Sequence, residues 1–300
     1  MKKIFLVAIL ILTCAITFAQ EEKDSIKDGW RTSGKITLLI NQSAFSNWQS
    51  GGDNNFAGNI DVNYDFNYTK SLWSLDNKFL ASYGLSKSGD DDVRKSDDRL
   101  ELNSILSRKL KKNWSASFFM NFKTQFTDGY DYQDGFIGDN EDFQTAGLFK
   151  PAYWSFGPGF LWKKSDNLFV NFAPLTSKFT FITSEIFSYN ENTNTYDSSN
   201  DYETFGVAPG DTSLFEFGLN IRAYSKFDLM KNVSMENILS LYSNYLDKPQ
   251  NVDVDYTMNL VMKINDYLST NLTFQTIYDD NAYSGFQIRE VFGLGVNLNF

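Results

Sequence analysis

The final nine residues, Phe292 to Phe300, place apolar side chains and small or polar side chains at alternate positions. In a β-strand, Phe292, Leu294, Val296, Leu298 and Phe300 share one face, and glycine and asparagine share the other. The first face suits hydrocarbon and the second suits a wet or closely packed interior, which is the pattern of a transmembrane barrel strand. The chain end therefore predicts an all-β protein that crosses a membrane by closing into a barrel.

The same alternation recurs along the chain. From Phe56 to Tyr68 every second residue is apolar, aromatic or glycine, and this run exceeds the usual globular strand. Further strong runs cover 73–85, 114–126, 215–227, 252–264 and 268–278, and weaker runs cover 34–40, 100–110, 152–162, 168–181 and 233–245. With the terminal strand, they predict a transmembrane antiparallel up-and-down β-barrel of about 12 strands, an even number as bacterial barrels have.

The connections between these runs alternate in length. Short ones lie at 69–72, 109–113, 163–167, 228–232 and 265–267, and longer ones at 41–55, 86–98, 127–151, 183–212, 244–251 and 279–285. If both termini lie in the periplasm, every short connection becomes a periplasmic turn and every long one an external loop. A secreted soluble β-protein, the alternative fold, gives no reason for this sorting.

The amino terminus predicts export. Two lysines precede an apolar run and small residues follow it, so residues 1–19 are expected to be a secretory signal peptide, with 20–33 a short periplasmic segment and 34–300 the barrel. Cys14, the only cysteine, lies in the signal, and its neighbours do not favour lipidation. No later stretch has the roughly twenty apolar residues of a membrane helix. The expected location is the cell outer membrane.

Composition excludes several functions. The formal net charge is −10, whereas a nucleic-acid partner would favour a basic face. The chain has no histidine, which removes the Ser-His and Cys-His arrangements of hydrolases and zinc sites with nitrogen ligands. We therefore expect neither an enzyme nor a bound cofactor.

Two prolines fall within predicted strands. Pro158 and Pro174 each lack the N–H that a closed wall needs for its ladder of hydrogen bonds. A β-bulge is the structural explanation, which the neighbouring Gly157 and Gly159 favour. An opening of the wall toward the bilayer is the functional alternative.

The long connections are acidic. The third contains Asp128, Asp131, Asp134, Asp139, Glu141 and Asp142, whereas the short turns are rich in lysine. A solvated, self-repelling outer face explains this pattern best. Divalent cations are the alternative ligands, because carboxylate oxygens suit Ca²⁺ and Mg²⁺. Asp139, Glu141 and Asp142 are the candidate metal ligands, although their spacing matches no ordered calcium loop.

Three segments together resemble a known family. They are Phe45-Ser46-Asn47-Trp48-Gln49-Ser50-Gly51-Gly52-Asp53-Asn54, Pro174-Leu175-Thr176-Ser177-Lys178 and Tyr242-Ser243-Asn244-Tyr245-Leu246. The chain is similar to the uncharacterised Bacteroidetes outer-membrane barrel family named domain of unknown function 3078, over nearly the whole mature chain. The resemblance implies an outer-membrane β-barrel and no defined activity. Trp48, Gly51 and Gly52 match its most recognisable motif, either as a tight turn at the rim or as a recognition loop over the lumen.

The predicted inward positions carry both signs of charge. They include Asp61, Asp65, Asp253, Asp255, Arg222 and Arg289. Mixed charges admit two functions: a narrow polar channel or transport pathway, or a non-conducting scaffold whose acidic external loops serve binding or surface structure. The expected partners are outer-membrane lipid and lipopolysaccharide, divalent cations at the acidic loops, and the barrel-assembly machinery, because the terminal strand is similar to the insertion signal of Gram-negative barrels. No nucleic acid is expected.

Overall fold

A computed structural model describes residues 28–45, 53–131, 143–190, 193 and 195–300. Twelve long strands close into one antiparallel barrel, which confirms the predicted fold class and the strand number. These strands are β1 (Gly29–Ser43), β2 (Asn55–Lys70), β3 (Trp73–Ser88), β4 (Arg94–Lys111), β5 (Trp114–Thr124), β8 (Ala152–Ser165), β9 (Leu168–Phe181), β12 (Ser213–Met230), β13 (Val233–Asn244), β14 (Val252–Lys263), β15 (Leu268–Asp279) and β16 (Tyr283–Asn299). No helix among the described residues is long and apolar enough to cross a membrane.

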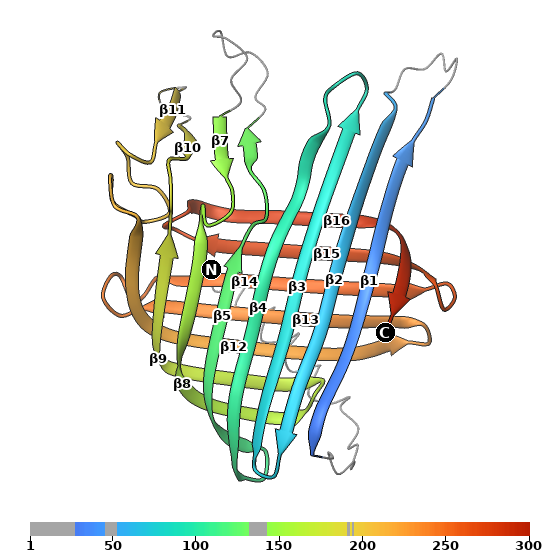
Figure 1. The fold of residues 1–300 in the computed structure, drawn as a ribbon, viewed down its shortest axis with the longest axis vertical. Helices are drawn as coiled ribbons and strands as arrows, with labels where there is room; N and C mark the ends of the chain where they lie inside the picture. The colour runs from blue at the N-terminus through green and yellow to red at the C-terminus, as the bar shows by residue number, and fades with distance from the viewer. Residues whose placement is uncertain (1–27, 46–52, 132–142, 191–192, 194) are drawn as a thin grey trace.

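Neighbours in the wall are mostly neighbours in sequence. The order is β1-β16-β15-β14-β13-β12-β9-β8-β5-β4-β3-β2, and β2 returns to β1. In Figure 1 the strands β1 to β5 form a steep front wall, and β13 to β16 cross behind them at a wide angle. This crossing follows from the strand tilt that barrel closure requires. Side chains from the two walls therefore face each other across the lumen.

Several boundaries differ from the sequence prediction. The first strand begins at Gly29 rather than Gly34, and the last begins at Tyr283 rather than Phe292. The connection expected to be long at 279–285 is therefore a turn of only three residues, 280–282, and the second long connection shrinks to 89–93. The two longest loops contain strands of their own: β6 (Gly129–Asp131) pairs with β7 (Phe143–Ala146), and β10 (Phe187–Asn190) pairs with β11 (Thr195–Ser198).

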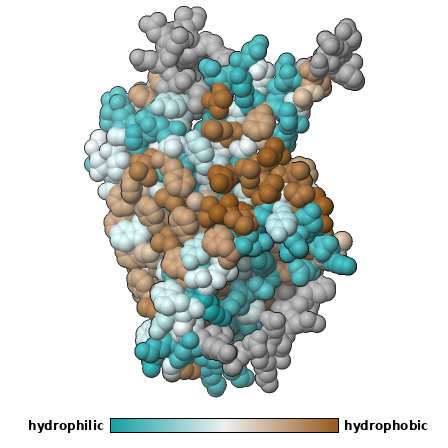
Figure 2. Space-filling view, turned by 45° about the vertical axis from the view of Figure 1, so that its right-hand side comes forward, coloured by the Kyte–Doolittle hydropathy of each residue, from teal (hydrophilic) through white to brown (hydrophobic). Residues whose placement is uncertain are grey.

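The wall has an apolar outer face and a polar inner one. On β16 the outward side chains of Phe292, Leu294, Val296 and Leu298 are exposed, whereas the inward Asn297 is buried and bonded to Thr37 and Ser269. Hydrophobic residues gather in a belt across the middle of the molecule, with hydrophilic residues toward both ends (Figure 2). This arrangement fits a wall surrounded by hydrocarbon, because polar groups in the belt would have no water to bind.

The two strand prolines lie at register breaks. The β8–β9 ladder is interrupted between Phe156 and Phe160, and the β9–β12 ladder shifts beside Pro174. The backbones are closely packed there, since a Cβ on Gly157 would lie 2.3 Å from the Leu175 carbonyl oxygen. A β-bulge therefore explains both prolines, and the wall is not open at this point.

Candidate functional site

A lysine gathers several carboxylates at the loop-side end of the lumen. Lys178 on β9 places its Nζ 3.0 Å from Glu216, 3.2 Å from Asp253 and 3.8 Å from Asp279. The same ammonium lies 4.8 Å from the centre of the Tyr242 ring. Glu216 is only 2% exposed, and besides Lys178 it accepts a hydrogen bond from Asn244 over 3.3 Å. We call Lys178, Glu216, Asp253 and Asp279 the loop-side cluster.

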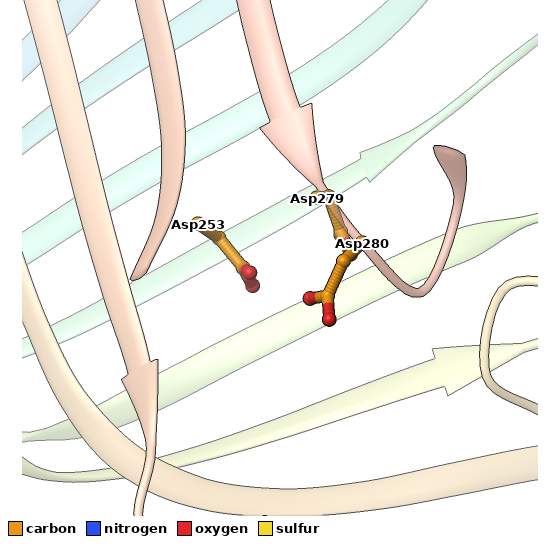
Figure 3. A group of neighbouring side chains, drawn as sticks. All are labelled: Asp253, Asp279 and Asp280. Atoms are coloured by element: carbon orange, nitrogen blue, oxygen red, sulfur yellow. The ribbon is translucent and has the colours of Figure 1, made fainter. Parts of the chain in front are cut away.

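Three carboxylates converge in this region with the spacing of a metal site. Oxygen atoms of Asp253, Asp279 and Asp280 lie within 4.8 Å of one another (Figure 3). Lys178 contacts two of the three, but its single positive charge is shared with Glu216 as well. Asp279 and Asp280 were not singled out from the sequence because that stretch was assigned to a long external loop. The predicted ligands Asp139, Glu141 and Asp142 lie outside the described residues.

A second group of charges crosses the lumen below this cluster. Arg99 donates to Glu101, Arg222 lies 3.8 Å from the same carboxylate, and Lys123 on β5 lies 3.0 Å from Asp255 on β14. Because β5 and β14 lie on nearly opposite sides of the wall, the Lys123–Asp255 pair spans the interior. We call these five residues the charge layer.

Amide side chains complete the charge layer. Asn103 and Asn121 donate to Glu101 over 2.7 and 3.1 Å, and Gln275 donates to Asp255 over 2.9 Å. Glu101 is 4% exposed. A buried carboxylate is tolerated only where ion pairs and hydrogen bonds replace its water, and Glu101 has both. The carboxylates of the charge layer therefore have both ion-pair and hydrogen-bond partners within the lumen.

Apolar side chains also fill part of the lumen. Ile105, Phe119, Leu161 and Ala173 form a buried cluster, with Phe169 packed against it. They come from strands β4, β5, β8 and β9, which are consecutive in the wall. Inward apolar residues on adjacent strands narrow the lumen on this side, and Ile105, Leu161 and Phe169 also line the cavity described below.

Toward the short turns, ion pairs again join opposite walls. Lys78 on β3 lies 3.4 Å from Asp65 on the neighbouring strand and 3.5 Å from Glu236 on β13, which is six strands away in either direction. Tyr224 and Asn259 both donate to Glu236, over 2.7 and 2.9 Å. A single lysine therefore holds two distant parts of the wall together.

The turn between β8 and β9 carries a further ion-pair group. Lys163 lies 2.7 Å from Asp76 and 2.9 Å from Asp166, and Arg31 lies 3.6 Å from Asp166. Burial alone would raise the pKa of the Asp166 carboxyl, but Lys163 and Arg31 hold that pKa below its ordinary value. Asp166 is therefore ionised at neutral pH and bridges β1 to this turn.

Between these groups the barrel is hollow. A cavity of about 980 Å³ is lined mainly by residues of the turn-side half, including Lys35, Asp65, Lys226, Lys263 and Asp266, and extends to Asn59, Ser82 and Arg289 in the loop-side halves of their strands. Arg99 and Arg222 of the charge layer also line it, whereas no residue of the loop-side cluster does. We call this cavity the vestibule. It is a chamber lined by charged, polar and apolar side chains, and it reaches up to the charge layer from the side of the short turns.

The six charges singled out from the sequence all occupy inward register positions. Asp61 and Asp65 line the vestibule, Arg222 and Asp255 belong to the charge layer, and Asp253 to the loop-side cluster. Arg289 donates to Asp97 across the lumen. Of the four aspartates, Asp65, Asp253 and Asp255 are already paired with lysine. The motif residues Trp48, Gly51 and Gly52 lie outside the described residues.

Comparison with known proteins identifies a family over part of the chain. The profile of the family described as "Protein of unknown function (DUF3078)" matches residues 40–130. The resemblance seen in the sequence is confirmed over this segment. It covers Trp48, Gly51 and Gly52, whereas the segments at 174–178 and 242–246 lie beyond it. No curated protein matches the chain.

Solved structures that resemble the chain are distant. The translocator domain of autotransporter NalP from Neisseria meningitidis is 9% identical, with 92% of this chain and 90% of that one covered and a TM-score of 0.36. The COG4313 outer membrane channel from Pseudomonas putida F1 is 11% identical, with 94% and 99% covered and a TM-score of 0.39. Outer membrane phospholipase A from Escherichia coli is 9% identical, with 94% and 96% covered and a TM-score of 0.32. Nothing about the activity of this chain follows from likenesses this distant.

Proposed function

We propose that the protein is an integral outer-membrane barrel that does not conduct ions along its axis in this state, and that it serves as a scaffold for its acidic loops. The observation that carries the proposal is the charge layer. Its members are ion-paired and hydrogen-bonded across the lumen, and Glu101 is buried, so an ion crossing the barrel would have to break contacts such as Lys123–Asp255.

Planar-bilayer conductance of the purified, folded protein tests this proposal. We expect no steady single-channel current from the unchanged chain. The double variant Lys123→Ala/Asp255→Ala removes the pair that spans the interior and is expected to produce current steps. The matched control is Asp247→Ala/Lys248→Ala, which removes an exposed ion pair in a loop and should stay silent. Steady current through the unchanged chain would overturn the scaffold proposal.

A narrow channel is the second candidate, favoured by the vestibule and the charged side chains among its lining. In that case carboxylates would concentrate cations at the mouth and in the lumen. Asparagine at Asp61, Asp65, Asp253 and Asp255 would keep side-chain size while removing charge. If current is seen, a fall in cation preference in this fourfold variant, measured as reversal potential under a KCl gradient, would support the channel.

We further propose that the protein is not an enzyme, because the chain has no histidine for the Ser-His and Cys-His arrangements of hydrolases. Association with lipopolysaccharide rests on the acidic loops, whose carboxylates would bind divalent cations that bridge to its anionic groups. Recognition by the barrel-assembly machinery rests on the alternating pattern of the terminal strand. The signal peptide at 1–19 lies outside the described residues and stays a prediction.

A further inference from the structure

Three lysines enter the turn-side part of the vestibule from separate strands. Lys35 lies on β1, Lys226 on β12 and Lys263 on β14, and all three line the cavity. In the wall, β12 is five strands from β1, and β14 lies between them. Lys226 therefore faces Lys35 from nearly the opposite side of the ring, with Lys263 on the arc that joins them. We call these three residues the vestibule lysines.

The positive charges of the vestibule lysines repel one another. Lys35 is partly buried, and the other two are close enough to act on its ammonium group. Asp61 and Glu236 attract the same group, but Glu236 already lies 3.5 Å from Lys78. Like charges that face each other across a cavity raise the energy of the folded chain. An anion placed between them would lower it.

The other cationic side chains that line the vestibule have carboxylate partners. A carboxylate oxygen lies within 4.0 Å of each of Arg31, Lys78, Arg99, Lys163, Arg222 and Arg289. Within the described part of the chain, no such pair includes a vestibule lysine. Asp228 and Asp266 line the same cavity but lie farther than this from the three ammonium groups. The vestibule lysines therefore keep their hydrogen-bond donors available for a ligand.

Solvent reaches the vestibule lysines from the side of the short turns. Two of the three are exposed, and the cavity lining continues to Asn265 and Asp266 in the turn between β14 and β15. At the same end of the barrel, the connection between β4 and β5 adds the exposed Lys109, Lys111 and Lys112. Basic residues around the mouth of a low-dielectric cavity raise the local concentration of anions. A dissolved anion would therefore be drawn to this end of the barrel.

The donors present favour a phosphate group. Lysine binds phosphate as a compact charge with three rotatable donors, whereas bidentate recognition of a planar carboxylate is the role of arginine. Asn63 and Asn299, the register partners of Lys35 on its two sides, also line the vestibule and can donate amide hydrogens. The cavity volume of about 980 Å³ suits a small molecule.

We propose that the turn-side part of the vestibule binds a small phosphorylated solute, whose phosphate oxygens accept hydrogen bonds from Lys35, Lys226 and Lys263. The proposed membrane orientation decides only which compartment supplies the solute, which is the periplasm. The site lies on the opposite side of the charge layer from the acidic loops. It is measured by binding and not by conductance, so this inference and the scaffold proposal can fail separately.

Calorimetric titration with pyrophosphate tests the site. The full chain is folded in micelles of a detergent that has no phosphate group, at physiological ionic strength, and we expect saturable binding. Lys35→Gln/Lys226→Gln/Lys263→Gln should weaken this binding by about tenfold or more, because each lost ammonium removes a charge-assisted hydrogen bond. The matched control is Lys109→Gln/Lys111→Gln/Lys112→Gln, which removes the same charge from the same end of the barrel. It should change the affinity by less than about twofold, because exposed charges outside the cavity are screened.

Urea titration of tryptophan fluorescence separates a binding role from a structural one. Pyrophosphate should raise the unfolding midpoint of the unchanged chain and of the control variant, and it should leave the vestibule variant unchanged. Without pyrophosphate the vestibule variant should be at least as stable as the unchanged chain, because the repulsion between its lysines is gone. If the triple variant does not fold, Lys263→Gln alone, at the exposed end of β14, should still bind pyrophosphate more weakly than Lys112→Gln does.

Three outcomes would overturn the proposal. The first is no saturable binding of pyrophosphate by the unchanged chain. The second is an equal loss of affinity in the vestibule variant and the control variant, which would mean that the anion is held only by the general charge of the turns. The third is citrate binding as tightly as pyrophosphate, which would overturn the choice of phosphate because citrate presents a similar charge on carboxylates.

Discussion

An arginine placed at each of two neighbouring positions of β2, Val62 and Asn63, should distinguish the lipid-facing side of the strand from the lumen-facing side. Val62 is the eighth of sixteen residues in this strand, so it lies near the middle of the apolar belt. It stands between Ile36 and Ala81, whose side chains share the outer face. Arginine near the bilayer midplane of a barrel costs about 2–4 kcal/mol. Val62→Arg should therefore lower the folded-to-unfolded ratio roughly 30- to 700-fold, at tenfold for each 1.4 kcal/mol.

The matched control is Asn63→Arg, one residue along the same strand. Asn63 lines the vestibule, and an arginine there would lie near Asp61 and Asp65 on the same face of the strand, although Lys35 is its cross-strand neighbour. The expected cost is small because the charge stays in a polar cavity. Urea titration of tryptophan fluorescence in lipid vesicles measures both variants. Equal destabilisation of the two would refute the face assignment.

Two further predictions follow from the loops and the bulge. An epitope tag inserted after Asn200 should bind antibody on intact cells, whereas one inserted after Lys112 should bind only after permeabilisation, and the opposite labelling would reverse the orientation. Gly157→Ala should destabilise the barrel by about 2 kcal/mol or more, because its Cβ would overlap the Leu175 carbonyl oxygen. Gly58→Ala, whose Cβ would have no atom closer than 3.7 Å, should be near neutral in the same urea titration. Similar values for both variants would contradict the close packing at the bulge.

The sequence predicted which face of each strand points to lipid, because a register shift of one residue would move every lumen-facing side chain into lipid and every lipid-facing side chain into the lumen. Along Phe56 to Tyr68, a shift by one position would put Asp61 and Asp65 into lipid, so only one register is stable. The ends of strands were harder to predict. On β16 the exposed Glu290 interrupts the outward apolar series, and this interruption concealed that Phe286 and Ile288 belong to the same strand.

Contacts across the lumen could not be predicted from alternation. The pattern shows that Lys123 and Asp255 both point inward, but it says nothing of depth or of which strands oppose one another. Those depend on strand tilt and on how the wall closes. The loop-side cluster was missed in part for the same reason, because Asp279 belongs to a strand whose end the sequence placed in a loop.

The contact of Lys78 with Glu236 has a consequence for how the barrel is built. These residues lie on opposite sides of the completed ring, so a sheet that has grown by one hairpin at a time, from either end, leaves both side chains in water on its concave face. Their attraction contributes nothing to any partial sheet. It appears only when the circumference is complete, and so it favours the finished ring over every open precursor without making any precursor more stable. A variant that lost this pair would be expected to grow its hairpins at the usual rate and to close the ring less readily, although the β1–β16 ladder and the Lys123–Asp255 pair would still favour closure.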